Sequence, residues 1–219
     1  MTTDSQQLFA WRRGSDPYKS DREIRRFYDP RFKATAVMVL PGRHYVTSDR
    51  NEMIVTVLGS CVAACIRDPS IGVGGLNHFL LPESESGQWG SATAAMRYGN
   101  HAMETLINDI IKRGGLRERL EVKVFGGGNI IDSQSMSPIG TKNAEFVEKY
   151  LHNEGFQIAA KHLCGPLPRR IHYFPTSGMV KMLLLRRNPD REILNKERDY
   201  RMKVKAETEV ESGDVELFD

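Results

Sequence analysis

The middle of the chain alternates short apolar runs with longer amphipathic segments. Eight short runs are rich in valine, isoleucine and alanine and are bounded by glycine, proline or polar turn residues, which is typical of β-strands. They occupy residues 36–40, 53–57, 61–66, 73–81, 120–125, 156–162, 169–174 and 179–187. The turns at 68–72 and 175–178 predict hairpins between their flanking strands.

Two longer segments have the helical repeat instead. Residues 92–113 predict a helix that ends at Gly114, and residues 141–154 predict a second one that ends at Gly155. Their inward positions are Met103, Leu106, Ile107, Ile110, Ile111, Phe146, Val147, Tyr150 and Leu151. Because strands outnumber helices and hairpins mix with crossovers, we expect an α/β fold with one or two mixed sheets.

The two ends of the chain lack a sustained apolar period. Residues 1–35 are polar and Arg-rich, and we assign them to an N-terminal extension. Residues 188–219 form a charged C-terminal tail, in which residues 207–219 contain six acidic residues and no basic ones. Residues 36–187 are therefore the expected folded domain, and we expect it to fold without residues 1–30 and 200–219.

Composition narrows the class of protein. The net charge of +3 is too small to indicate nucleic-acid binding. Three cysteines in 219 residues argue against a disulfide framework and for a reducing compartment. The N-terminus lacks the apolar core of a signal peptide, and the apolar runs are too short to insert into a membrane. These features predict a soluble, cytoplasmic protein.

One hairpin brings together residues that can carry chemistry. The stretch "TVLGSCVAACIRDPSIGVGGLNHFLLP" covers residues 56–82. If its turn is centred between Pro69 and Ser70, Cys61 lies directly opposite His78 on the same face. Directly opposed side chains have Cβ atoms about 4.5–5.5 Å apart, which allows an imidazole to reach a thiol. A bulge at the glycine pair 74–75 would shift this register.

A Cys–His pair is the usual form of a thiol nucleophile. The imidazole removes the thiol proton and later protonates the leaving group. The turn at Gly59 and Ser60 can present backbone N–H groups to an oxyanion. Each residue also has an ordinary explanation, since a strand cysteine is usually a small core residue and a single histidine is usually structural. The two readings of Cys61 and His78 remain open on this pattern.

The other candidates indicate structure more than chemistry. Cys65 has the spacing of a core residue, and Cys164 lies in a loop without a charged setting. No second ligand pair with zinc-like spacing occurs, so we expect neither metal nor cofactor. The glycines 126–128 lack the lysine of a phosphate-binding loop, and they predict a tight turn or close backbone approach.

Several motifs together resemble the chemoreceptor glutamine deamidase family, CheD. They are "VTVLGSCVAACIRDPSIGVGGLNHFLLP", "MRYGNHAMETLI", "VKVFGGGNI", "IGTKNAEFVEKYL" and "RRIHYFPTSGMVKMLLLRR". They cover about residues 36–187. The resemblance implies an α/β mixed-sheet sandwich with flanking helices, similar to the Cys–His toxin deamidases, and it makes residues 36–187 a CheD-like deamidase domain.

The resemblance also implies an activity: hydrolysis of specific glutamine side chains to glutamate on methyl-accepting chemotaxis receptors, through a thioester on a cysteine nucleophile. The family's nucleophile falls on Cys61, its histidine on His78 and its threonine on Thr56. Some members hydrolyse receptor methyl esters or pair with a CheC-type phosphatase.

Alternatives to this activity remain. The chain can be another Cys–His acyl-transfer enzyme, or a non-enzymatic module that binds receptors or a phosphatase. Thr56 has an alternative too. As the third member of a triad its hydroxyl would accept an imidazole N–H, whereas the ordinary reading is a plain strand threonine. Asp68, the nearest carboxylate in the hairpin, lies at the far end from Cys61 and is not expected to reach the imidazole.

Overall fold

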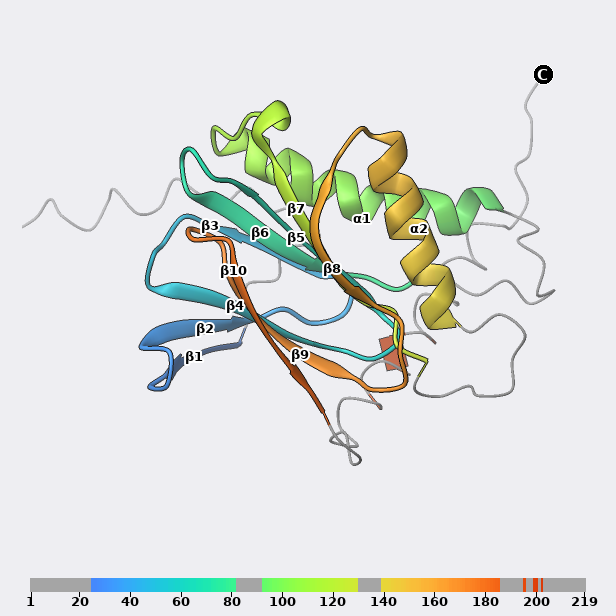
Figure 1. Cartoon of the computed structure of the whole chain (residues 1–219), viewed down its shortest axis with the longest axis horizontal. Coiled ribbons are helices and arrows are strands. Elements are labelled where there is room, and N and C mark those ends of the chain that lie inside the picture. The colour runs from blue at the N-terminus through green and yellow to red at the C-terminus, as the bar shows by residue number, and fades with distance from the viewer. Residues whose placement is uncertain are drawn as a thin grey trace, which may run out of the picture.

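The computed structural model describes residues 25–81, 92–129 and 139–185, together with 195, 199, 200 and 202. These residues form ten strands in two five-stranded sheets, two α-helices and one short 3-10 helix, η2 (Arg117–Arg119). The sheets pack face to face and the helices lie on one side of the pair (Figure 1). The α/β sandwich expected from the sequence is therefore present, with both helices on one sheet.

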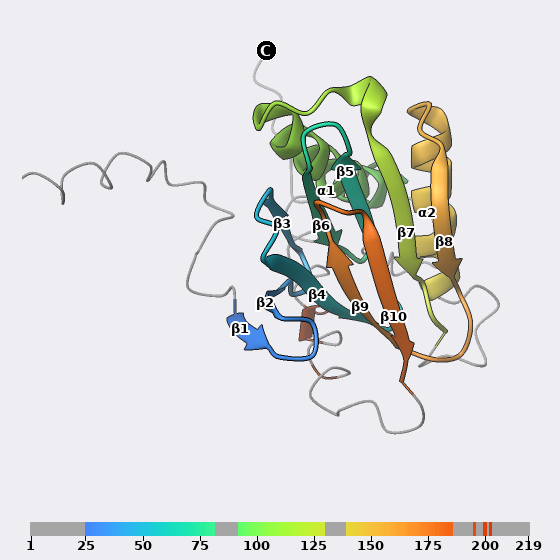
Figure 2. The ribbon, with the colours of Figure 1, turned by 60° about the vertical axis from the view of Figure 1, so that its left-hand side comes forward.

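The first sheet, sheet A, has the strand order β1-β2-β4-β9-β10. Its strands are β1 (Arg25–Asp29), β2 (Ala34–Met38), β4 (Glu52–Leu58), β9 (Arg169–Phe174) and β10 (Met179–Leu184). β2 and β4 are parallel and the other neighbours are antiparallel. The turned view of Figure 2 shows β9 and β10 in front of the second sheet.

The second sheet, sheet B, has the order β3-β6-β5-β7-β8. Its strands are β3 (Arg43–Thr47), β6 (Val73–His78), β5 (Val62–Asp68), β7 (Glu121–Gly126) and β8 (Ile158–Leu163). β7 and β8 are parallel and the remaining pairs are antiparallel. Each sheet therefore mixes both kinds of pairing, as the sequence predicts.

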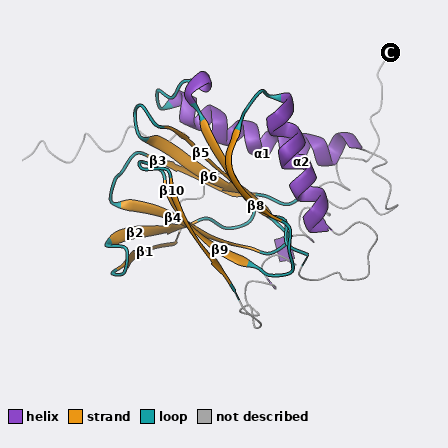
Figure 3. Ribbon diagram, viewed as in Figure 1, coloured by secondary structure: helices purple, strands orange, loops and turns teal. Residues whose placement is uncertain are grey.

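The helices α1 (Ala92–Lys112) and α2 (Ile139–Asn153) cover the outer face of sheet B (Figure 3). Neither is long and apolar enough to cross a bilayer. Of the predicted inward positions of the first helix, Met103, Leu106, Ile107 and Ile110 are buried, but Ile111 is exposed. The predicted end of the second helix is confirmed, since Gly155 takes a left-handed φ of +74° two residues after the helix.

Alternation along β5 divides its side chains between two cores. Val62, Ala64 and Ile66 pack with the helices, in a cluster that also holds Met103, Leu106 and Val147. Cys61, Ala63 and Cys65 point to the opposite side, into the layer between the two sheets. Because neighbouring strand residues face opposite ways, the two cysteines share the side that meets sheet A.

Two strands were missed by the sequence pattern. β1 is a mostly exposed edge strand, and β3 mixes polar and apolar residues without strict alternation. β1 and the start of β2 fall within residues 1–35, so the folded sheet begins earlier than the expected start at 36. The remainder of the extension and nearly all of the tail lie outside the described residues.

The predicted register of the β5–β6 hairpin is wrong by two residues. The strands pair Cys65 with Leu76 and Val62 with Phe79, so Cys61 lies next to Leu80 and not opposite His78. The loop is longer than expected, because Gly72 takes a φ of +68° and its N–H donates to the Asp68 carbonyl at 3.0 Å. A shift of two keeps each side chain on its face, so Cys61 and His78 remain on the same side.

Candidate functional site

The hydrogen bond between Thr56 and His78 joins the two sheets. Thr56 lies on β4 and His78 ends β6, and each side chain points into the layer between the sheets. Thr56 Oγ1 is 2.8 Å from His78 Nδ1 and 2.8 Å from the carbonyl oxygen of Val39. Both side chains are buried. The structure thus brings together two of the residues that the sequence singled out, from strands in different sheets.

These contacts determine which imidazole nitrogen carries the proton. A carbonyl can only accept, so the single Thr56 hydroxyl proton goes to Val39 and Oγ1 accepts from His78 Nδ1–H. The other ring nitrogen, Nε2, is then an unprotonated acceptor. It is buried and has no hydrogen-bond partner among the residues that the structure describes. His78 therefore has its acceptor nitrogen unused.

Burial keeps His78 neutral. Loss of solvation lowers its pKa to about 3, and the backbone carbonyl of Val39, which favours the protonated ring, only partly opposes this shift. At neutral pH the ring carries a single proton, on Nδ1, and Nε2 can accept another. The backbone of His78 is fixed as well, since its carbonyl accepts the Gly42 N–H at 2.7 Å.

Cys61 lies on the same face of sheet B, diagonal to His78. Its side chain is fully buried, at 0% exposure, in the layer between the sheets. Diagonal neighbours on one face of an antiparallel pair have Cα atoms about 7–8 Å apart, a distance that an imidazole can bridge. The corrected register therefore keeps Cys61 and His78 on one face in a diagonal arrangement, with no hydrogen bond between His78 Nε2 and the thiol among the described contacts.

The turn before Cys61 is held by three hydrogen bonds to consecutive carbonyl groups. Gly128 N–H donates to Gly59 O at 2.7 Å, and Gly127 N–H donates to Cys61 O at 2.7 Å. The Asn143 side-chain amide donates to Ser60 O at 3.0 Å. Since the carbonyl and N–H of a trans peptide point in opposite directions, the amides of Ser60 and Cys61 face away from these donors.

The triple glycine contacts this turn directly, which confirms the predicted close backbone approach. A Cβ atom on Gly126 would lie 2.2 Å from the Cys61 carbonyl oxygen, and Gly126 and Gly127 have φ values of +119° and +66°. Any side chain at residue 126 would displace the nucleophile turn. The sequence pattern predicts a turn at these glycines but does not connect them with Cys61.

Asn143 was also missed. It is buried on α2, where its amide donates to Ser60 O and its Oδ1 accepts the Leu81 N–H at 2.9 Å. It therefore connects the chain before β5 with the chain after β6. A polar residue among the inward positions of a predicted amphipathic helix is the signal that could have identified it.

The other cysteines and Asp68 lie apart from this arrangement. All three thiols are unbridged. Burial raises the pKa of the Cys65 thiol, in the layer between the sheets, although the charge of Lys123 acts against that shift. Cys164 is partly exposed in a loop, with a φ of +61°. Asp68 bonds to Ser70, Leu116 and Arg119, so it does not orient the imidazole.

Comparison with known proteins identifies relatives along most of the chain. The family model described as CheD chemotactic sensory transduction matches residues 80–183. A probable chemoreceptor glutamine deamidase CheD from Rhodopseudomonas palustris (strain BisA53) is 57% identical over 195 residues, which cover 89% of this chain and 90% of the relative.

Two further relatives have the same printed name. The protein from Saccharophagus degradans is 46% identical over 199 residues, with coverage of 89% and 90%. The one from Janthinobacterium sp. (strain Marseille) is 45% identical over 192 residues, with coverage of 88% and 93%. The family-model match begins at Leu80, so Thr56, Cys61 and His78 lie outside it.

Proposed function

The chain belongs to the CheD family, and from this premise we propose that it hydrolyses glutamine side chains of methyl-accepting chemotaxis receptors to glutamate and ammonia. The observation that carries the proposal is the hydrogen bond from His78 Nδ1 to Thr56, which leaves Nε2, on the face that holds Cys61, without a partner among the described residues. A structural histidine is expected to use both ring nitrogens when buried.

In the proposed reaction Cys61 is the nucleophile and His78 is the general base. The Nε2 lone pair takes the thiol proton as the sulfur attacks the glutamine carboxamide carbon. The tetrahedral intermediate collapses when the C–N bond breaks, and the proton on Nε2 leaves with ammonia. His78 then removes a proton from water, which attacks the thioester, and the thiol regains a proton as glutamate is released.

Thr56 orients the base in this proposal. Its hydroxyl is committed to the Val39 carbonyl, so it can only accept from the imidazole. The histidine is therefore held in the tautomer whose Nε2 can accept a proton. A neutral hydroxyl does this without stabilising an imidazolium, unlike the aspartate of many triads.

We assign the oxyanion site to the backbone amides at Ser60 and Cys61. Their orientation is supported by the carbonyl hydrogen bonds of Gly59 and Ser60 to Gly128 and Asn143. Fixed dipoles of this kind stabilise developing charge without reorganisation during the reaction. Gly59 lies in the turn that is held by the N–H groups of Gly127 and Gly128 and by the side-chain amide of Asn143.

The domain bounds, the cellular location and the fold comparison follow from the same family membership. The proposed deamidase domain covers residues 36–187 together with β1 and the start of β2 at 25–35, and residues 188–219 form a tail. We propose that the protein acts in the cytoplasm and resembles the Cys–His toxin deamidases in its sandwich. Support comes from a Cys–His pair between two mixed sheets. Association with a CheC-type phosphatase remains a prediction.

Incubation with the cytoplasmic fragment of a methyl-accepting receptor tests the function. Mass spectrometry should find Gln-to-Glu changes of +1 Da at a few positions, with one ammonia released for each. Adding a primary amine distinguishes the alternatives, because a transglutaminase would incorporate it and a deamidase would continue to form glutamate. Receptor binding with neither change would instead indicate a non-enzymatic module and overturn the proposal.

A further inference from the structure

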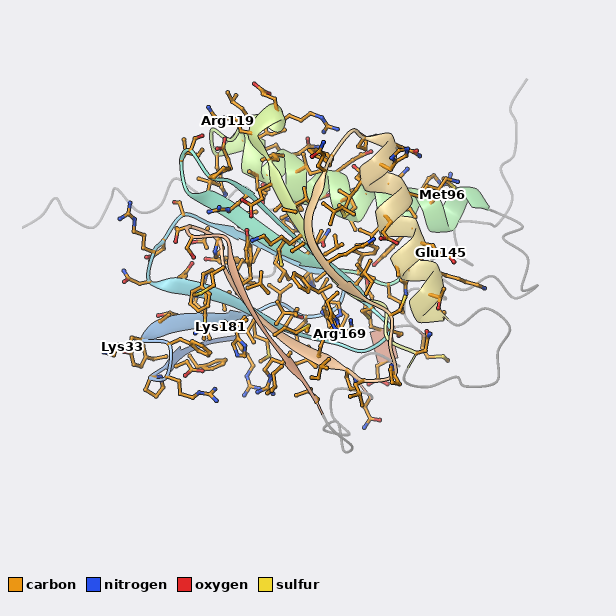
Figure 4. All side chains as sticks on the ribbon, viewed as in Figure 1. Lys33, Met96, Arg119, Glu145, Arg169 and Lys181 are labelled. Atoms are coloured by element: carbon orange, nitrogen blue, oxygen red, sulfur yellow. The ribbon has the colours of Figure 1, made fainter. Side chains whose placement is uncertain are left out.

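Arg169 is a fully buried arginine next to the nucleophile turn. It is the first residue of β9, its exposure is 0%, and it pairs with Leu58, the residue immediately before Gly59. Figure 4 labels it among the interior side chains, whereas Lys33 and Arg119 lie at the periphery. A guanidinium is among the groups least often buried unless it is paired with an acid.

The guanidinium has neutral partners only. Nη1 donates to His162 O at 2.6 Å and lies 2.8 Å from His162 Nδ1. Nη2 donates to the carbonyls of Cys164 and Leu167, the second at 3.3 Å. No carboxylate in the described part of the chain is within ion-pair distance of it, and its Nε is buried without a partner. Among the described residues, a positive charge is thus retained in the interior without a counter-ion, which is costly.

These partners connect Arg169 to Cys61 through two loops. The loop at 164–167, which Arg169 binds, is joined to the triple-glycine loop by Cys164 N–H to Gly126 O and by Asn129 N–H to Gly165 O, each at 2.9 Å. The triple-glycine loop in turn holds the carbonyls of Gly59 and Cys61. The chain of contacts from guanidinium to nucleophile turn is continuous.

Arg169 also touches this junction directly. A Cβ atom on Gly128 would lie 3.3 Å from Arg169 Nη2 and 2.9 Å from the Gly59 carbonyl oxygen. The guanidinium, Gly128 and Gly59 are therefore packed together without room for a methyl group. Displacing the guanidinium would open the contact that fixes the turn.

From this geometry we propose that Arg169 is a positioning residue for Cys61. It fixes the 59–61 turn through the two loops, and its buried charge, which no described carboxylate pairs with, favours the anionic form of the thiol and of the tetrahedral intermediate. The inference rests on the proposed function for its catalytic consequence. Its effect on the thiol itself does not depend on any substrate. Low-dielectric surroundings make such a buried charge effective over a longer range than at the surface.

The test compares Arg169→Met and Arg169→Lys in the full chain. Iodoacetamide alkylation of Cys61, followed by peptide mass spectrometry from pH 5 to 10, reports the thiolate. We expect the alkylation midpoint of Arg169→Met to rise by about one pH unit, the lower end of the usual effect of a lost nearby charge. Lysine keeps the charge without the forked donors, and we expect it to restore the midpoint partly.

Receptor deamidation by the same variants separates positioning from substrate binding. For Arg169→Lys we expect kcat to fall by about 10- to 100-fold with little change in KM, the pattern of a misplaced reacting group. Arg67→Met is the matched control. Arg67 is a largely buried arginine paired with Glu121, about 20 Å along β5 from Cys61. Its loss should reduce stability and leave the alkylation midpoint unchanged.

A second variant covers the case in which both Arg169 variants fail to fold. Gly128→Ala keeps the arginine but pushes its methyl group against Gly59 O and the guanidinium. It should lower kcat in the same way. An unchanged kcat and alkylation midpoint in Arg169→Lys or, failing that, in Gly128→Ala would overturn the proposal. A wild-type protein whose Cys61 alkylates normally but deamidates nothing would overturn the proposed function alone, because the midpoint shift tests Arg169 independently.

Discussion

The two ends of β5 bury polar groups in different ways. At the Asp68 end, the carboxylate is buried and accepts hydrogen bonds from Arg119, Leu116 and Ser70. At the Cys61 end, His78 Nε2 and Arg169 Nε are buried without partners among the described residues. Polar groups are buried at both ends, but only at the Asp68 end do hydrogen bonds from described residues compensate for the lost solvation.

The pKa shifts follow the same division. Burial alone would raise the pKa of Asp68, but the hydrogen bonds from Arg119 and from the Leu116 and Ser70 amides outweigh it and lower the pKa. No comparable partner restores His78, so burial lowers its pKa to about 3. Satisfied polar groups stabilise a fold, whereas unsatisfied ones keep a capacity to react. The comparison therefore separates a structural end from a reactive end.

Removing the nucleophile should give the largest effect. We expect Cys61→Ala to abolish receptor deamidation, because no other thiol lies on the His78 face beside the held turn. Cys65→Ala is the matched control, since it changes a thiol on the same face of the same strand. The measurement is Gln-to-Glu conversion by mass spectrometry. Full activity in Cys61→Ala, or loss only in Cys65→Ala, would place the reactive end elsewhere.

His78→Asn should follow, with turnover reduced by about 10²–10⁴, the usual contribution of a positioned acid–base group. The same substitution should also change how the free energy of unfolding depends on pH, because His78 makes the wild-type protein less stable at low pH. Between pH 6.5 and about 3 the unfolded chain binds a proton at His78 that the folded protein excludes. The free energy of unfolding therefore falls as pH falls through this window, by up to about 1.4 kcal/mol per pH unit.

In His78→Asn this part of the pH dependence should disappear. Urea denaturation at several pH values between 3 and 7 measures it. His101→Asn, at an exposed position on α1, is the control for removal of a histidine. Equal pH slopes for wild type and His78→Asn would mean that His78 is not buried neutral.

Asp68→Asn tests the structural end. An amide cannot accept all the hydrogen bonds of the carboxylate, so we expect a loss of about 1–3 kcal/mol in the free energy of unfolding. Because the pKa of Asp68 is lowered in the fold, its contribution is present above pH 4 and is lost as the pH falls further. Activity per folded molecule should be retained. A fall in kcat without a loss of stability would show that the two ends are coupled.

Among the substitutions at the reactive end, Thr56→Val should have the smallest effect. Valine is nearly isosteric, so thermal stability should change little, but His78 Nδ1 loses its acceptor and its tautomer is less well defined. We expect deamidation to fall about tenfold, less than for His78→Asn, because a hydroxyl orients without adding charge. Steady-state kinetics on a receptor fragment measure it. Undiminished turnover would leave the Val39 carbonyl as the orienting group.

The sequence by itself determined the local features of this protein. Apolar runs and helical repeats gave eight of the ten described strands and both α-helices, because each is encoded by neighbouring residues. It also determined that Cys61 and His78 share a face, since alternation along a strand survives a register shift of two. β1 was missed because it is mostly exposed, and β3 was missed because it pairs with β6, a strand distant in sequence.

Only the tertiary structure decided how the site is held. The register depended on the left-handed Gly72, whose loop length a pattern of apolar residues does not encode. The proton position on His78 depended on Val39, seventeen residues from Thr56, and the nucleophile turn depended on Gly127, Gly128 and Asn143. Hydrogen bonds between distant segments have no sequence period. They form only when the two sheets pack, and for that reason they could not be predicted from the chain alone.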